Sequence, residues 1–175
     1  MAVASALKHP EGPLEYTRIG GSAKYFASYL HHNVIIMRWM RGLNLEAVRE
    51  LKASNDRAHE QSGSSQSSSI HLVFPEIELP DAAARAVLPT LAKESAVRTA
   101  CTAVVVHGGG FKVSAMRAII TGLRAVLPGQ VFDLRANATI EELLGWFPAE
   151  HHRRTGVALD VASLRRVLEH IERTT

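Results

Sequence analysis

Residues 100–136, ACTAVVVHGGGFKVSAMRAIITGLRAVLPGQVFDLRA, contain the pattern that decides the fold: a strand, a helix and a second strand. Residues 103–106 form a short β-branched run without charge, which is typical of a strand covered on both faces by helices. Three glycines follow it. Residues 113–127 then place apolar side chains at three- and four-residue steps, which predicts a helix lying on a sheet. After a Pro-Gly pair, residues 131–134 predict the next strand, reached by a right-handed crossover.

Two segments upstream of this unit predict a hairpin at the start of the domain. Residues 24–30 (KYFASYL) and 34–40 (VIIMRWM) are rich in aromatic and β-branched side chains, which favour strands. The connection HHN ends in Asn33, a residue that tolerates the left-handed conformation of a tight turn. Residues 14–19 could add a further short strand.

A helix and a strand are predicted after the hairpin. Asn44 is a favourable N-cap for residues 45–60, whose apolar positions recur at helical spacing. The low-complexity segment 62–69 (SGSSQSSS) has no side chain able to anchor a core, which predicts a mobile loop. Residues 70–74 (IHLVF) predict the next strand, with His71 and Val73 on the face opposite Ile70, Leu72 and Phe74.

Two further helices begin at recognisable caps. Asp81 precedes a helix over residues 82–96, which Pro89 should kink or divide. Thr139 precedes residues 140–147 (IEELLGWF), with Glu142 in the capping-box position. Leu143, Leu144 and Phe147 are expected to face inward.

The C-terminal segment, residues 148–175, is predicted to be a polar hinge (148–156, PAEHHRRTG) followed by an amphipathic helix over 161–173. One face of that helix carries Leu164, Val167, Leu168 and Ile171. An isolated helix of this length is marginal in water, so the apolar face must pack on something. It packs either on its own sheet or on a second copy of the chain; the homodimer is the favoured expectation.

Length and composition favour one globular domain. Of the 175 residues, 46% are hydrophobic and 21% charged, near the average for globular proteins, so one core is expected. Residues 1–13 are predicted to be a flexible leader and residues 14–147 an α/β domain. No apolar run approaches the roughly 20 residues of a membrane span, and no secretory signal is apparent, so a cytoplasmic location is expected. Cys101 is the single cysteine and is predicted to be a buried, inert thiol.

Charge does not favour nucleic acid as a partner. The formal net charge is +3, but the basic residues are scattered among 17 acidic ones with few aromatic residues between them. Arg38 and Arg41 flank Trp39, which could present an aromatic ring with cations to a ligand. The alternative is that Trp39 packs in the core while the arginines face solvent.

The HGGGF motif at 107–111 is similar to the oxyanion-hole segment of some esterases. However, the sequence has no G-x-S-x-G nucleophile motif, and the remaining residues are too few for the rest of such an enzyme. The glycines also lack the spacing of dinucleotide-binding or P-loop motifs. A tight turn is therefore expected, and no catalytic residue is predicted.

The nine histidines do not form a recognisable metal motif. His31/His32 and His151/His152 are adjacent pairs, whereas two ligands on one helix face need i, i+4 spacing. Surface histidines, no metal and no cofactor are expected.

The order of predicted elements resembles the STAS family, the anti-sigma-factor antagonist (SpoIIAA-like) domain, over about residues 24–147. VIIMRWMRGLN looks like the family's second strand and the glycine before its first helix, and IEELLGWF looks like its closing helix. The resemblance implies a mostly parallel mixed sheet with an N-terminal β-hairpin and packed helices, here with an extra C-terminal helix. Members that act as phosphoswitches carry an Asp-x-Ser-Gly-type segment after the strand equivalent to 70–74. This chain has no Ser or Thr between Phe74 and Arg85.

The resemblance implies a non-enzymatic regulatory or scaffold module that binds another protein. Its expected partner surface is Pro75, Glu76, Glu78, Pro80, Asp81 and Arg85. The alternative is a small-molecule or lipid-binding domain with an apolar pocket. Four residues could line such a pocket or simply pack in the core: Trp39, Met40, Trp146 and Phe147.

Overall fold

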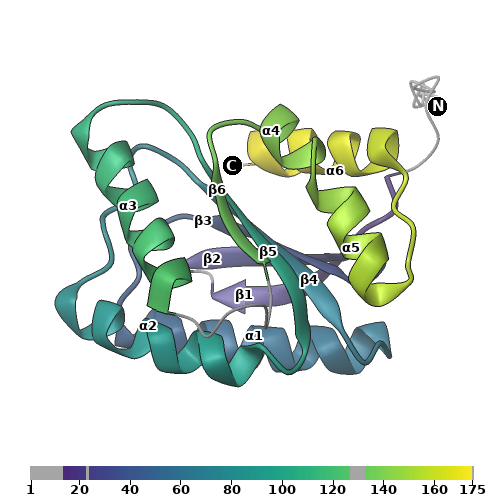
Figure 1. Ribbon diagram of the computed structural model, residues 1–175, viewed down its shortest axis with the longest axis horizontal. Coiled ribbons are helices and arrows are strands. Elements are labelled where there is room, and N and C mark those ends of the chain that lie inside the picture. The colour runs from purple at the N-terminus through teal and green to yellow at the C-terminus, as the bar shows by residue number, and fades with distance from the viewer. Residues whose placement is uncertain (1–13, 23, 127–132, 175) are drawn as a thin grey trace, which may run out of the picture.

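The computed structural model describes residues 14–22, 24–126 and 133–174, where one sheet has helices on both faces (Figure 1). The strands are β1 (Thr17–Ser22), β2 (Phe26–His31), β3 (Val34–Trp39), β4 (Ser67–Val73), β5 (Thr99–Val106) and β6 (Asp133–Asn137). The helices are α1 (Leu45–Ser62), α2 (Ala82–Ser95), α3 (Phe111–Val126), α4 (Ile140–Leu144), α5 (Phe147–Thr155) and α6 (Val161–Arg173). The leader predicted for residues 1–13 lies outside the described residues.

The sheet has the order β1-β2-β3-β4-β5-β6. β1, β2 and β3 pair antiparallel, whereas β3 to β6 pair parallel. The α/β class, the mostly parallel sheet and the hairpin of β2 and β3 are therefore confirmed. The turn residue with positive φ is His32 (φ 54°), not the expected Asn33. Asn33 is instead held by its side chain, which donates to the carbonyl of Gln66 at 3.1 Å.

Helices cover the two faces of the sheet in two groups (Figure 1). α1, α2 and α3 lie on the face that buries Phe26, Met37 and Trp39, and α4, α5 and α6 lie on the other. Alternate side chains of a strand point to opposite faces, so neighbouring residues of one strand belong to different cores. The predicted inward positions Leu143, Leu144 and Phe147 are confirmed as buried.

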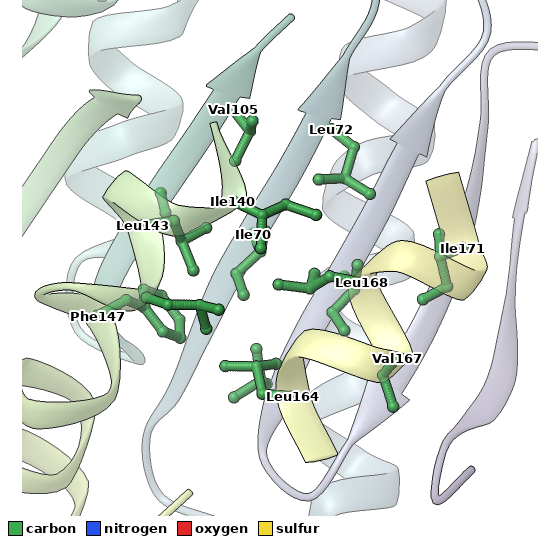
Figure 2. Packing of buried hydrophobic residues seen from close by; sticks show 14 of the residues in the cluster. Ile70, Leu72, Val105, Ile140, Leu143, Phe147, Leu164, Val167, Leu168 and Ile171 are labelled. Carbon is green, nitrogen blue, oxygen red and sulfur yellow. The ribbon is translucent and has the colours of Figure 1, made fainter. Parts of the chain in front are cut away.

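The apolar stripe of α6 packs on its own sheet, so the prediction that it forms a dimer interface is wrong. Figure 2 shows Leu164, Val167, Leu168 and Ile171 among side chains from β4, β5 and α4. All four are fully buried within a single chain. Burial of each such side chain contributes roughly 1.5–3 kcal/mol, which stabilises α6 on the domain without a second copy.

Residues 148–156 are not a hinge, because α5 occupies Phe147–Thr155. Pro148 stands in the first turn, where a missing N–H costs nothing, and Gly156 ends the helix at φ 75°. The polar composition of this segment reflects its outer face, whereas Phe147 and His151 are buried against the sheet. Residues 148–174 therefore belong to the same domain as the rest of the described chain.

The serine-rich loop is shorter than predicted. β4 begins at Ser67, and Ser67, Ser68 and Ser69 are buried. Small hydroxyl side chains can enter a core when they find partners there: Oγ of Ser69 lies 2.8 Å from Oγ1 of Thr102. Only residues 63–66 remain between α1 and β4.

Several helix boundaries follow the predicted caps. The side chains of Asn44, Asp81 and Thr139 each accept a hydrogen bond from a backbone N–H in the first turn. α2 is not divided by Pro89 but runs continuously past it.

The described part of the chain contains no helix that is both long and apolar enough to cross a membrane.

Candidate functional site

A cavity of about 190 Å³ lies between the sheet and the helices α1, α2 and α3. Its walls are mainly aliphatic. The aliphatic side chains that α2 and α3 contribute to them include Leu88, Leu91, Met116, Ile119, Ile120 and Leu123. α2 has one fully buried residue, Ala84, so most of its inner face looks onto the cavity rather than into a packed core. The space is large enough for a small organic molecule, since an apolar cavity of about 150 Å³ can hold benzene.

The floor of the cavity is formed by strands β4, β5 and β6. Ser69, His71 and Val73 alternate along β4 and therefore point to this one face. The parallel register places Thr102 beside Ser69 and Val104 beside His71. The floor therefore carries polar groups at its centre, although the walls are aliphatic.

His71 is the most distinctive of these groups. Its Nδ1 lies 3.1 Å from the indole Nε1 of Trp39, and the two rings stack with centroids 6.1 Å apart. Part of its surface faces the cavity, yet the ring lies deep in the protein, and this burial lowers its pKa to about 4. The imidazole is therefore neutral near pH 7.

The mouth of the cavity is bordered by the loop between β4 and α2. Ile77, Glu78 and Pro80 of this loop line the cavity together with Arg41. Oε2 of Glu78 accepts a hydrogen bond from the backbone N–H of Gly42 at 2.9 Å. Backbone hydrogen bonds from Glu78 itself and from Gly42 lower the pKa of this carboxyl.

The predicted partner surface maps onto the same loop and the start of α2. Pro80 is buried, and the other five members are exposed: Pro75, Glu76, Glu78, Asp81 and Arg85. The structure thus brings five of the six residues together at the surface. Asp81 also caps α2, because its side chain accepts a hydrogen bond from the backbone N–H of Ala84.

The predicted lining of an apolar pocket is correct for one residue of four. Trp39 lines the cavity, but Trp146 and Phe147 pack on the opposite face of the sheet, and Met40 lies at the surface. Trp39 is buried, as the alternative interpretation predicted, and the guanidinium of Arg38 lies over the ring of Phe74 at 4.8 Å. The signal that could have indicated the cavity is His71, a polar residue within the apolar strand IHLVF.

The HGGGF motif forms a turn, as predicted. Gly108 and Gly110 have φ of 83° and 91°, and α3 begins directly afterwards at Phe111. A Cβ at Gly108 would lie 2.7 Å from Cγ of Pro75. His107 stacks on Phe74, and its Nε2 lies 2.8 Å from Oε1 of Glu172 in α6. These contacts hold the loop against the rest of the domain.

A second polar cluster lies in the opposite core. His151 Nε2 is 2.9 Å from Asn33 Oδ1, its Nδ1 is 2.8 Å from Ser68 Oγ, and Ser68 Oγ is 3.1 Å from Cys101 Sγ. Cysteine, histidine and asparagine also form catalytic sets, but here all of these side chains are buried. Burial raises the pKa of Cys101 to about 12, so the thiol stays protonated and is a poor nucleophile.

The histidine pairs differ from the expectation that they are surface residues. His31 and His151 are fully buried, while their neighbours His32 and His152 are exposed. In the described part of the chain, no group of three or more His, Cys, Asp or Glu side chains is arranged to hold a metal ion.

The chain matches no protein-family model, and no curated protein is similar to it at a significant level.

Proposed function

We propose that this protein is a non-enzymatic binding domain that holds a small, mainly apolar molecule between the sheet and helices α1–α3. The observation that carries this proposal is the cavity, with its aliphatic walls and a central polar floor. Ligand sites of proteins commonly combine mostly apolar walls with a few polar groups that orient the ligand.

An NMR titration with ethylbenzene tests this function. The probe should perturb methyl resonances of Leu91, Ile119 and Ile120, which line the cavity. Replacing Ala92, which also lines it, with Phe should fill the space and abolish binding. Ala83→Phe is the matched control, because Ala83 is exposed on the same helix. Equal binding by both variants, or none by the native protein, would contradict the proposal.

The absence of catalysis is part of the proposal. The cavity floor offers a neutral histidine and two paired hydroxyls, and the buried thiol of Cys101 lies on the other face. The protein should therefore not hydrolyse short acyl esters such as p-nitrophenyl acetate. Hydrolysis that disappears in the variant His107→Ala would contradict this expectation.

A second candidate function is binding of another protein through the loop between β4 and α2, as expected for a STAS-like regulatory module in the cytoplasm. The order of strands and helices supports the resemblance. The observation that favours this function is that Ile77, Glu78 and Pro80 border the cavity. A molecule in the cavity would contact the same loop that carries the exposed Glu76 and leads into the helical turn with the exposed Arg85, so ligand and partner binding would be coupled.

Cross-linking mass spectrometry tests the second function. A native partner should give cross-links near residues 75–85, and the double variant Glu76→Lys, Arg85→Glu should lose them. Lys93→Glu, a charge reversal elsewhere on α2, is the control. Cross-links that map to other elements, or that survive the double variant, would contradict this function.

A further inference from the structure

The proton on the His71 ring can be assigned from its neighbour. An indole N–H only donates hydrogen bonds, so the 3.1 Å contact from Trp39 Nε1 requires His71 Nδ1 to accept. A neutral imidazole has one accepting and one donating nitrogen. Burial keeps this ring neutral near pH 7, so the proton lies on Nε2.

The Nε2–H group of His71 has no acceptor among the described residues. Two other polar groups of the floor, Ser69 and Thr102, are paired with each other at 2.8 Å. His71 lines the cavity from β4, one of the two central strands of the sheet. This donor faces a mainly apolar cavity and has no acceptor among the described residues, and an acceptor brought in by a ligand would supply the missing hydrogen bond.

We propose that the natural ligand is a neutral, mainly apolar molecule of about single-ring size that carries an oxygen acceptor, such as a ketone, aldehyde or ether, for the Nε2–H of His71. This inference rests on the proposed function of the cavity. It names the chemical class of the ligand.

The other residues of the cavity restrict the charge and polarity of the ligand. The charged residues that line it are Arg41 and Glu78, both exposed at the mouth. A carboxylate or an ammonium group at the depth of His71 would therefore be buried without an opposite charge, which is unfavourable. A pure hydrocarbon would fit the walls but would leave the donor unpaired.

A comparison of acetophenone with ethylbenzene tests the inference. The two molecules have the same ring and two-carbon substituent, and they differ in a carbonyl group in place of a methylene. A net hydrogen bond should make acetophenone bind the native protein roughly three- to tenfold more tightly, as measured by calorimetric titration. His71→Phe should remove this preference while still binding ethylbenzene.

Nitrogen NMR of the native protein provides a test that needs no variant. Long-range ¹H–¹⁵N correlations should show a protonated Nε2 and an unprotonated Nδ1 in His71. Acetophenone should shift the Nε2–H proton resonance, and ethylbenzene should shift it much less. A protonated Nδ1 in the free protein would overturn the inference.

The outcomes separate the inference from the function on which it rests. Equal affinities for the two probes would overturn the assignment of an acceptor-bearing ligand, although the cavity would remain a binding site. Failure of both probes to bind would overturn the proposed function together with the inference.

Discussion

Nδ1 of His151 lies 2.8 Å from Oγ of Ser68 in the core between α5 and the sheet, although 83 positions separate the two residues in sequence. The directions of the hydrogen bonds in this cluster follow from chemistry. Asn33 Oδ1 accepts from His151 Nε2–H, so Nδ1 accepts the hydroxyl proton of Ser68. Ser68 Oγ in turn accepts the thiol proton of Cys101. The side chains of Asn33, Ser68, Cys101 and His151 thus form one connected set of hydrogen bonds.

Replacing His151 with Leu should lower the free energy of unfolding by roughly 1–3 kcal/mol, because Asn33 and Ser68 would remain buried without their partner. Urea denaturation monitored by circular dichroism measures the change. His152→Leu is the control, since His152 is exposed. Equal stability of the two variants would show that the cluster does not stabilise α5.

Stability should fall as the pH is lowered from about 6.5 towards 4. Burial lowers the pKa of His71 and His151 to about 4, whereas histidine in an unfolded chain titrates near 6.5. Within this range the unfolded state binds protons that the folded state does not, so acid favours unfolding. The pKa values of His31 and His59 are lowered in the same direction, mainly by burial.

The change between pH 7 and pH 5 should be on the order of 1–2 kcal/mol for each of His71 and His151. The groups near His71 are Trp39 and, at the mouth of its cavity, Arg41 and Glu78. Urea denaturation at both pH values, in the native protein and in His71→Phe, measures this contribution. An unchanged pH dependence in the variant would contradict it.

Leu164→Ala and Leu168→Ala should each destabilise the protein by about 2–5 kcal/mol, the usual cost of removing a fully buried leucine side chain. Thermal unfolding measures the loss, and light scattering should show no change in oligomeric state. Val161→Ala, at a more exposed position of the same helix, should have a much smaller effect. A stable variant with an altered molecular mass would indicate that α6 lies between two chains.

Gly42→Ala should be destabilising by more than the ~1 kcal/mol of an average substitution. The φ angle of Gly42 is not in the left-handed range, so the reason is close packing. A Cβ there would lie 2.9 Å from both Cβ and the carbonyl oxygen of Glu78. Gly109→Ala is the control, because a Cβ at Gly109 would have no atom within 4 Å beyond those of the adjoining residues. Equal melting temperatures of the two variants would contradict the close packing.

The sequence by itself determined the order of most strands and helices. Hydrophobic spacing and caps such as Asn44, Asp81 and Thr139 act locally, so they can be recognised without knowledge of distant contacts. The same reasoning failed for residues 67–69, because polar serines suggested a loop, whereas Ser68 and Ser69 find their partners on β5 and α5.

Only the tertiary structure decided what the apolar faces and buried polar groups contact. The stripe of α6 predicts burial but carries no information on whether its own sheet or a second chain covers it. Likewise, His71 and Trp39 are 32 positions apart, and their hydrogen bond depends on the parallel register of β3 and β4. Periodicity records which side of an element is buried, whereas a cavity arises from how several elements pack, and no single segment encodes that volume.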